Sequence, residues 1–244
     1  MRVAVLGATR GMGREVARRL ATRGDSLVLL GRTPAALDEL ATDLQVRGAR
    51  KVSTVPLDLA DPTSFAPALD AAKAFLTRID AVVITAGAFG TQEQLEDDVE
   101  LCHRVLDLDF TKTILLCEEV RKRLLADGGG QLVVFSSVAG DRGRKTVGLY
   151  GATKAGLSHY LDALDHRYRS AGLVTTCVKP GFVRTEMTAG LKEPPFAADP
   201  DEVAEVVVAA IDRQSPQVYA PGIWRLVMLV IRHLPRFVMR RVGF

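Results

Sequence analysis

The chain has 244 residues, of which 48% are hydrophobic, 25% are charged and 6% are aromatic. This composition excludes collagen-like, coiled-coil, disulfide-scaffold and intrinsically disordered proteins. The formal net charge of +3 arises at the C-terminus, because the segment from Ser215 to Phe244 contains five Arg and no Asp or Glu. The rest of the chain is slightly acidic, so no nucleic-acid-binding character is expected of it.

The cysteines and the N-terminus indicate a cytoplasmic protein. The cysteines are Cys102, Cys117 and Cys177. They lack the spacing of a metal or redox pair, so we expect free thiols in a reducing compartment and no metal site. The apolar start of the chain reaches Gly7 too early for a signal peptide. The most apolar segment, Ile223 to Ile231, contains Arg225, so we expect no membrane-spanning helix.

Short runs of Val, Ile and Leu alternate with helical stretches along the chain. The predicted strands span Val3–Leu6, Ser26–Leu30, Val52–Leu57, Ala81–Thr85, Gln131–Phe135, Leu173–Val178 and Gln217–Tyr219. The predicted helices span Gly11–Arg23, Pro34–Val46, Pro62–Leu76, Leu95–Leu125, Tyr150–Ala171 and Asp201–Asp212. Continuous apolar runs are typical of strands buried on both faces. The pattern therefore predicts an α/β protein with a doubly wound, seven-stranded parallel sheet in one domain over residues 1–222, and an extension over 223–244.

A glycine-rich turn follows the first predicted strand and opens the first helix. It reads Gly7-Ala8-Thr9-Arg10-Gly11-Met12-Gly13. Glycines at this place permit a tight turn and let backbone N–H groups approach a pyrophosphate at the positive end of a helix. Because the turn lies at the first strand-to-helix connection of an α/β chain, a dinucleotide site is favoured over a purely structural turn.

The residue after the second strand indicates which dinucleotide is preferred. A site for NAD usually offers a carboxylate there to the ribose hydroxyls, whereas this chain has Arg32 after Gly31. A guanidinium suits the 2′-phosphate of NADP(H), and Arg10 in the glycine turn supplies a second cation. The alternative is that both arginines are solvated surface residues. Asp25 precedes the second strand and is therefore expected at the opposite end of the sheet.

Ser137, Tyr150 and Lys154 form the main candidate catalytic group. Tyr150 and Lys154 are four residues apart on one predicted helix, so the phenol and the ammonium converge. A nearby cation stabilises the phenolate and makes the tyrosine a usable general acid or base. Ser137 follows the fifth predicted strand and is placed to orient a carbonyl oxygen. A Tyr–Lys pair at this spacing also arises by chance, so its weight comes from the surrounding motifs.

Together these motifs resemble the short-chain dehydrogenase/reductase family from roughly Arg2 to Tyr219. The glycine turn matches the family's G-x-x-x-G-x-G, Tyr150 and Lys154 match its Y-x-x-x-K, and the segment from Pro180 to Thr185 matches its P-G-x-V-x-T. The resemblance implies a Rossmann fold that binds a nicotinamide cofactor. It also implies a homodimer or homotetramer.

The resemblance further implies a role for each matched residue. Tyr150 is expected to donate a proton to the substrate oxygen, Lys154 to lower the pKa of Tyr150 and hold the nicotinamide ribose, and Ser137 to position the substrate. Asp58 is expected to face the adenine, and Thr185 the carboxamide. The expected cofactor contacts are Gly7, Thr9, Arg10, Gly11, Met12, Gly13, Arg32, Asp58, Leu59, Ala86, Gly87, Tyr150, Lys154, Pro180, Gly181, Val183 and Thr185.

Two positions depart from the family pattern. Asp109 stands where the family often has a catalytic Asn, and Thr85 stands where its N-A-G turn has Asn. A carboxylate accepts from a relay water but cannot donate as an amide does, and its charge disfavours a nearby phenolate. We expect Asp109 to belong to the catalytic group, with a helix-bending or water-binding role as the alternative.

The C-terminal part indicates a lipophilic substrate. A lid is expected over Glu186 to Ala198, and its apolar side chains favour a lipophilic ketone or alcohol, unless they only pack on the body. The extension reads as a basic amphipathic helix bent at Pro235, with Trp224 and Leu226 on its apolar face. Such a helix suits peripheral contact with the inner face of a membrane, or packing on the body or a second subunit.

We therefore interpret the chain as an NADPH-dependent carbonyl reductase, reversible as an alcohol dehydrogenase. In its C-terminal half, the stretches Gly190–Pro195 and Arg232–Phe237 are similar to bacterial decaprenylphosphoryl-keto-ribose reductases, which favours a lipid-linked ketone. One alternative is a regulatory or scaffold protein of the same fold that binds NADPH without turnover. Another is a sugar-nucleotide epimerase or dehydratase, which the length of the chain disfavours.

Overall fold

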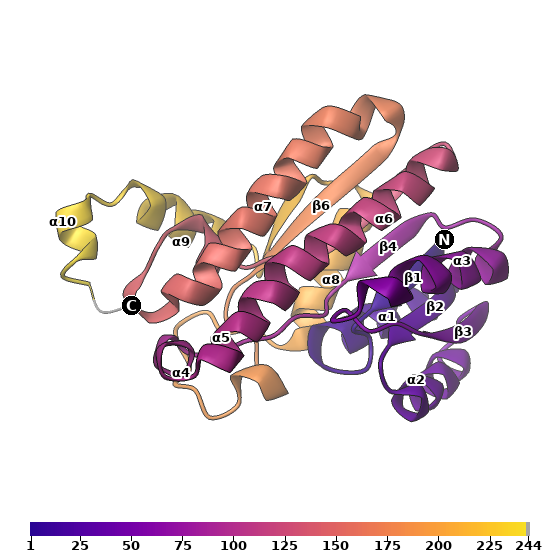
Figure 1. Ribbon diagram of the computed structural model, residues 1–244, viewed down its shortest axis with the longest axis horizontal. Helices are drawn as coiled ribbons and strands as arrows, with labels where there is room; N and C mark the ends of the chain where they lie inside the picture. Colours follow the sequence, from indigo (N-terminus) through magenta and orange to yellow (C-terminus); the bar gives the residue numbers. More distant parts are fainter. Residues whose placement is uncertain (243–244) are drawn as a thin grey trace.

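The computed structural model describes residues 1–242 and contains a seven-stranded sheet (Figure 1). The strands are β1 (Arg2–Leu6), β2 (Ser26–Gly31), β3 (Lys51–Pro56), β4 (Ala81–Ile84), β5 (Gly130–Phe135), β6 (Leu173–Pro180) and β7 (Gln217–Ala220). All pair in parallel, in the order β3-β2-β1-β4-β5-β6-β7. The predicted fold class is confirmed. The last two residues of the predicted extension, 243 and 244, lie outside the described residues.

The strand order reverses next to β1, and this reversal positions the candidate site. Val5 of β1 pairs with Leu29 of β2 on one side and with Val83 of β4 on the other. From this point the connections run outward in opposite directions, which leaves a crevice at the carboxyl ends of β1 and β4. All three paired residues are completely buried, which explains why apolar runs rather than alternating patterns mark the strands.

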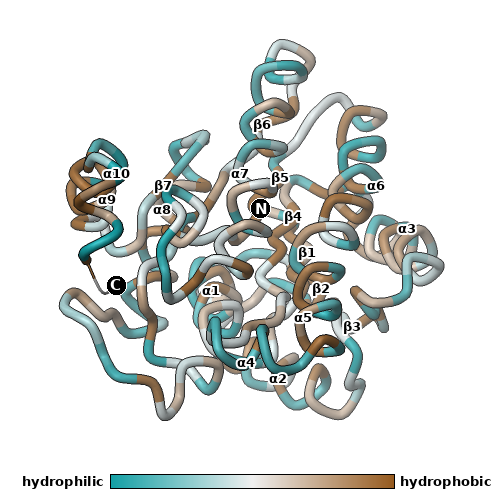
Figure 2. The backbone as a smooth tube through the Cα atoms, turned by 60° about the vertical axis from the view of Figure 1, so that its left-hand side comes forward, coloured by the Kyte–Doolittle hydropathy of each residue, from teal (hydrophilic) through white to brown (hydrophobic). Residues whose placement is uncertain are grey.

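Helices cover both faces of the sheet. They include α1 (Gly11–Thr22), α2 (Pro34–Val46), α3 (Phe65–Leu76), α7 (Gly148–Tyr168) and α8 (Pro200–Asp212). One apolar layer joins α1, α2 and α8 to the sheet, and the other joins α3, α6 (Thr113–Ala126) and α7 to its opposite face. Figure 2 shows hydrophobic stretches along the central strands and hydrophilic turns at much of the periphery.

The predicted helix from Leu95 to Leu125 is not continuous. The chain forms α4 (Gln92–Asp97), α5 (Val99–Leu106), a π-helical segment over Asp107–Lys112, and then α6. The first break is a cap, because Asp98 is extended and its side chain accepts a hydrogen bond from Leu101 N. The π-helical segment contains Asp109. Such segments occur frequently at functional sites, since they widen the helix by one residue and re-aim its side chains.

The extension packs on the body through one face of α9 (Ile223–His233). Trp224, Met228 and Ile231 are buried against Val138 and Tyr219. Trp224 lies directly on Gly181, where a Cβ would come within 1.9 Å of the indole Nε1. A short helix, α10 (Arg236–Met239), follows Pro235. The predicted bend is therefore present, and the inner face of α9 packs on the body.

The apolar side chains of the extension divide between a buried side and an exposed side of α9. Trp224 is buried, whereas Leu226, Leu229 and Val230 are more than half exposed, because they point away from the body on the other side of α9. Within residues 1–242, no helix is both long and apolar enough to cross a membrane.

Replacing Trp224 with Ala is expected to loosen the extension. The loss of a buried indole and the cavity it leaves cost about 3 kcal/mol in comparable cases. Undocking should therefore become about 100-fold more frequent, and trypsin should cleave faster at the arginines of α9 and α10. The cleavage rate is followed by mass spectrometry. Leu226→Ala, on the exposed side of the same helix, is the control, and equal acceleration in both variants would contradict the packing described here.

Candidate active site

The glycine-rich turn is held by close backbone contacts. Gly7 and Gly11 adopt positive φ angles of +85° and +50°, a region that L side chains rarely occupy. At Gly13 a Cβ would come within 2.3 Å of the Gly7 carbonyl oxygen, so a larger residue would separate α1 from the turn. The hydroxyl of Thr85 is shared between the carbonyl oxygens of Leu6 and Gly7, at 3.0 and 3.1 Å. Thr85, which stands where the family's N-A-G turn has Asn, therefore holds the glycine-rich turn against the end of β4.

Three of the predicted motifs meet at one cavity of about 480 Å³. The glycine-rich turn, the Thr85-Ala86-Gly87 turn and the segment from Thr185 to Met187 line it, and Thr9 and Met12 are half-buried beside it. Thr185 reaches across to the turn, since a Cβ on Gly11 would lie 3.3 Å from its methyl group. The cavity opens at the carboxyl ends of β1 and β4, where a doubly wound sheet binds its ligand.

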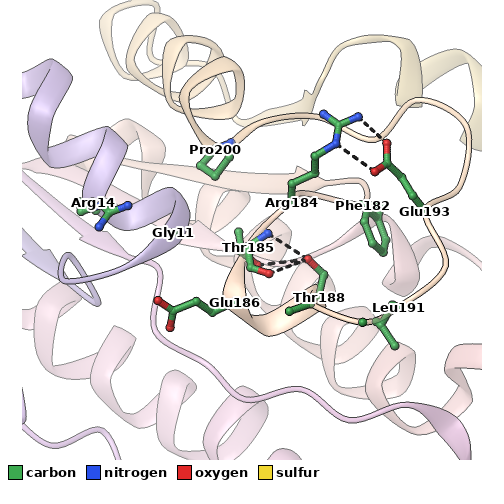
Figure 3. A pocket seen from close by; sticks show the side chains of 12 residues that line it. Gly11, Arg14, Phe182, Arg184, Thr185, Glu186, Thr188, Leu191, Glu193 and Pro200 are labelled. Atoms are coloured by element: carbon green, nitrogen blue, oxygen red, sulfur yellow. Dashed lines mark hydrogen bonds and ion pairs between the residues drawn. The ribbon is translucent and has the colours of Figure 1, made fainter.

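A second cavity, of about 490 Å³, adjoins the first beneath the predicted lid (Figure 3). The stem of the lid is fixed by Thr188, whose hydroxyl accepts from Thr185 N and donates to Val183 O. Arg184 forms ion pairs with Glu193 and Asp199, and Figure 3 shows the pair with Glu193 crossing the loop. Pro180, Gly181 and Val183 lead from β6 into this stem.

The residues predicted to bind the adenosine end lie along the same edge. Arg32 is exposed directly after β2. Arg10 is paired with Glu186 of the lid at 2.8 Å, with about three quarters of each side chain exposed, so the pair is weak and exchangeable. After β3, Asp58 accepts a hydrogen bond from Ala60 N at 3.0 Å, and Leu59 is buried. Asp25 pairs with the N-terminal ammonium at the opposite end of the sheet.

The four predicted catalytic residues come from β5, the π-helical segment and α7. Ser137 follows β5, and its hydroxyl accepts a hydrogen bond from Ala139 N at 3.1 Å, which leaves its own proton free for another acceptor. The Tyr150 ring packs edge-on against Phe89, with the ring centroids 5.1 Å apart. Ser136 is structural, because its hydroxyl donates to Lys154 O on α7. The two adjacent serines therefore make different contacts.

Lys154 and Asp109 form a buried ion pair beside Tyr150. Lys154 Nζ lies 3.2 Å from Asp109 Oδ2, and the two side chains are 6% and 0% exposed. Nζ also donates to Phe135 O at 3.3 Å and lies 5.5 Å from the centroid of the Tyr150 ring. The other carboxylate oxygen, Asp109 Oδ1, accepts from Ala88 N at 2.6 Å. Asp109 therefore joins α7 to the end of the Thr85-Ala86-Gly87 turn, which lines the first cavity.

These contacts govern the protonation of Tyr150 and Lys154. Burial raises the pKa of Tyr150, and the nearby Asp109 charge adds to this effect, while Lys154 and Ser137 oppose it. For Lys154, burial disfavours the ammonium, but attraction to Asp109 and Tyr150 outweighs burial and raises its pKa. At neutral pH the site therefore holds a charged lysine beside a protonated tyrosine.

Some contacts at the site were not predicted from the sequence. Gln92 accepts a hydrogen bond from Leu149 N at the start of α7, one residue before Tyr150. Phe89 and the backbone N–H of Ala88 also contact the catalytic group. These residues follow the Thr85-Ala86-Gly87 turn, so that turn is the sequence feature that could have indicated their place at the site. A backbone donor carries no side-chain signature, and its use by Asp109 depends on the fold.

Comparison with known proteins gives consistent matches over most of the chain. The sequence profile described as short chain dehydrogenase matches residues 1–195. An uncharacterized oxidoreductase of Mycobacterium tuberculosis is 32% identical over 240 residues, which cover 98% of this chain and 96% of the relative. Cis-4-hydroxycyclohexanecarboxylate dehydrogenase of Sinomonas cyclohexanicum is 32% identical over 219 residues, which cover 84% of this chain and 87% of the relative.

A solved structure supports the fold. A variant of actinorhodin polyketide ketoreductase with NADPH superposes with a TM-score of 0.79, covering 91% of this chain and 97% of its own. At 24% identity, this likeness concerns the fold alone.

Replacing Asp109 with Asn is expected to lower the pKa of Tyr150. The substitution removes a negative charge that opposes the phenolate, and Lys154 remains close enough to stabilise it. The tyrosinate absorbance is titrated with pH in the full chain and in Tyr150→Phe, and the difference isolates Tyr150. Asp107→Asn, in the same π-helical segment but partly exposed beside Lys112, is the control. An unchanged titration in Asp109→Asn would show that Asp109 does not act on the phenol.

Proposed function

This chain belongs to the short-chain dehydrogenase/reductase family and is an oxidoreductase, and we propose that it is an NADPH-dependent carbonyl reductase, reversible as an alcohol dehydrogenase. The observation that carries this proposal is the buried ion pair of Lys154 and Asp109 next to the half-buried Tyr150, beside the glycine-lined cleft. The group can hold a proton on a phenol next to a fixed cation, which suits proton delivery to a carbonyl oxygen.

A nicotinamide dinucleotide fits the residues of the cleft. A Cβ at Gly7 would come within 2.7 Å of Ala86 N, and a Cβ at Gly13 would be equally crowded. Both positions therefore carry no side chain, and a pyrophosphate can approach the backbone of the turn. The cleft volume of about 480 Å³ is within the range of cofactor sites. When bound, NADPH supplies the hydride that adds to the carbonyl carbon.

In the proposed reaction, Tyr150 gives its proton to the carbonyl oxygen, while Ser137 donates a hydrogen bond to that oxygen and orients it. The hydride electrons form the new C–H bond, and the C=O π electrons take up the Tyr150 proton, so the product is an alcohol. The phenolate left on Tyr150 is stabilised by Lys154, which Asp109 keeps charged and in place. The negative charge of Asp109 disfavours the phenolate directly. Asp109 therefore assists the reaction by keeping Lys154 charged and in place.

We propose NADPH over NADH because of Arg32. Its side chain is exposed after β2, and no ion pair among the described residues occupies it. A guanidinium at this place pairs with the 2′-phosphate, whereas it offers little to a free hydroxyl. Arg10 can add a second contact once it leaves the weak pair with Glu186.

We further propose a lipophilic or lipid-linked ketone as the substrate. The lid exposes Met187 and Phe196, which are 48% and 53% accessible, on a loop beside the cleft. The Phe196 ring lies edge-on to Trp224 at 6.5 Å, and Phe196 O accepts from the indole N–H at 3.2 Å. The lid and the extension therefore form one apolar wall.

We also propose a cytoplasmic homodimer or homotetramer. Large apolar side chains are exposed along α5, the π-helical segment and α6, which lie next to α7. They are Val99, Leu106, Phe110 and Leu115. Such a patch suits contact with a second copy of the chain. All three cysteines are free thiols in the structure, which fits the expected reducing compartment.

Replacing Tyr150 with Phe is expected to abolish ketone reduction and to leave NADPH binding nearly unchanged. The loss of the proton donor should lower the rate by about 100-fold or more. Turnover is followed by NADPH oxidation on a panel of lipophilic ketones. Binding is followed by energy transfer from Trp224, the single tryptophan, which lies on Gly181, next to Phe182 of the second cavity. Full activity in the Phe variant would remove Tyr150 from the reaction, and NADPH binding without turnover in the unmodified chain would favour the regulatory alternative.

Replacing Arg32 with Asp is expected to reverse the cofactor preference. The affinity for NADPH should fall by about 100-fold, because a carboxylate faces the 2′-phosphate, while NADH should bind equally well or better. Both affinities are measured by the same energy transfer. Equal weakening of the two cofactors would remove Arg32 from the phosphate site.

A further inference from the structure

A basic cleft of about 370 Å³ lies between the segment before α7 and the C-terminal extension. Five cationic side chains line it: Arg142, Arg144, Lys145, Arg236 and Arg240. Three of them come from the connection between Ser137 and Tyr150, and two come from the end of the chain. No carboxylate is among the lining residues that the structure describes.

Ion pairs among the described residues do not neutralise the positive charge of this basic cleft. Within residues 1–242, none of the five cations is within ion-pair distance of an acidic side chain. Asp141 adjoins the cleft in sequence, but its Oδ1 is paired with Lys179 at 2.6 Å and its Oδ2 accepts from Tyr219 OH at 2.7 Å. The two side chains of that pair are 8% and 3% exposed, so the carboxylate of Asp141 is held in the body and not in the cleft.

The contacts that do form inside the cleft hold it together without removing charge. Lys145 Nζ donates to Arg240 O at 2.6 Å, and Arg142 donates to Leu234 O at 3.1 Å. Carbonyl oxygens satisfy hydrogen-bond donors, but they carry no net charge. The two contacts therefore bring distant cations together at a cost in repulsion, which a bound anion would offset.

Arg144 contributes a buried hydrogen-bond donor to the cleft. Its Nε is fully buried and has no acceptor among the described residues. Burial lowers the pKa of the guanidinium, with only an opposing influence from Asp141. A buried donor without an acceptor is unusual in folded proteins and calls for a specific cause. An acceptor that arrives with a ligand is such a cause, since Arg144 lines the cleft.

The position of the cleft relates it to the reaction. Arg142 follows Ser137 by five residues, and Lys145 precedes Tyr150 by five residues. Five residues span at most about 17 Å, so the backbone of Arg142 lies within that distance of Ser137, and the backbone of Lys145 within that distance of Tyr150. Figure 1 shows α9 and α10 beside the N-terminal end of α7, where Tyr150 lies.

We propose that this basic cleft binds a phosphate group of the substrate whose carbonyl is held by Ser137 and Tyr150. This inference rests on the proposed reductase and narrows its substrate to a ketone that carries a phosphate ester. Arginine forks match phosphate oxygens in pairs, and several cations are needed for a group with up to two negative charges. The phosphate belongs either to a soluble ester or to a lipid. Phe237, between Arg236 and Arg240, is 62% exposed and suits the lipid source.

The phosphate site is tested by titrating inorganic phosphate into the full chain, saturated with NADPH so that the cofactor occupies its own phosphate contacts. Binding is followed by phosphorus NMR at constant ionic strength. Arg144→Gln and Arg236→Gln should each weaken phosphate binding by about ten-fold. Arg225→Gln is the matched control, because Arg225 is an exposed arginine of α9 outside the cleft. Equal weakening in the control, or none in the cleft variants, would overturn the proposal.

Vesicles distinguish the two sources of the phosphate. The chain is sedimented with phosphatidylcholine vesicles that contain or lack phosphatidic acid. Retention on the acidic vesicles that Arg236→Gln loses and Arg225→Gln keeps would assign a lipid phosphate, and phosphate binding without vesicle binding would assign a soluble ester. The Arg236 variant changes an exposed side chain, so its folding is not at risk.

Neither measurement requires turnover. Phosphate binding at the cleft in a chain that reduces no ketone would contradict the reductase alone. Conversely, ketone reduction in a chain whose cleft variants bind phosphate normally would contradict the phosphate site alone.

Discussion

The ion pair between Lys154 and Asp109 is the contact on which the site depends. It crosses from α7 to the π-helical segment in a buried environment, where removing one partner would leave an uncompensated charge. Asp109 also accepts from Ala88 N, and Gly87 lies so close that a Cβ there would be 2.8 Å from Asp109 Oδ1. One carboxylate therefore aligns the catalytic helix with the turn after β4. Through Thr85, that turn fastens the glycine-rich loop.

A second set of contacts links the substrate side of the site to the C-terminal extension. Trp224 fills the space over Gly181 and donates to Phe196 O in the lid. Tyr219, under the same helix, donates to Asp141, which is paired with Lys179. The extension is thus attached both to the lid and to the connection that carries Ser137. This arrangement connects residues late in the chain with the lid and with the connection after β5.

Much of the fold and part of the site followed from local patterns. The predicted strands agree with β1 to β7 to within two residues at each end, because continuous Val, Ile and Leu runs are required wherever helices cover both faces. The break in the helix from Leu95 to Leu125 escaped prediction. Its apolar spacing continues through Asp107–Lys112, and a π-helical segment is stabilised by packing rather than by propensity. Asp109 was singled out by its departure from a family pattern, but its pairing with Lys154 was not foreseen.

Local patterns predict the order of the elements, the glycine-rich turn and the spacing of Tyr150 and Lys154, because each depends on residues within a few positions of one another. Which distant groups meet depends on how the whole chain packs. Lys145 and Arg240 are 95 residues apart, and their contact makes one basic cleft from two unremarkable charged segments. The carboxylate of Asp141 is likewise kept out of that cleft by its ion pair with Lys179 of β6. The energy of a charge depends on its neighbours and its burial, and neither is encoded locally.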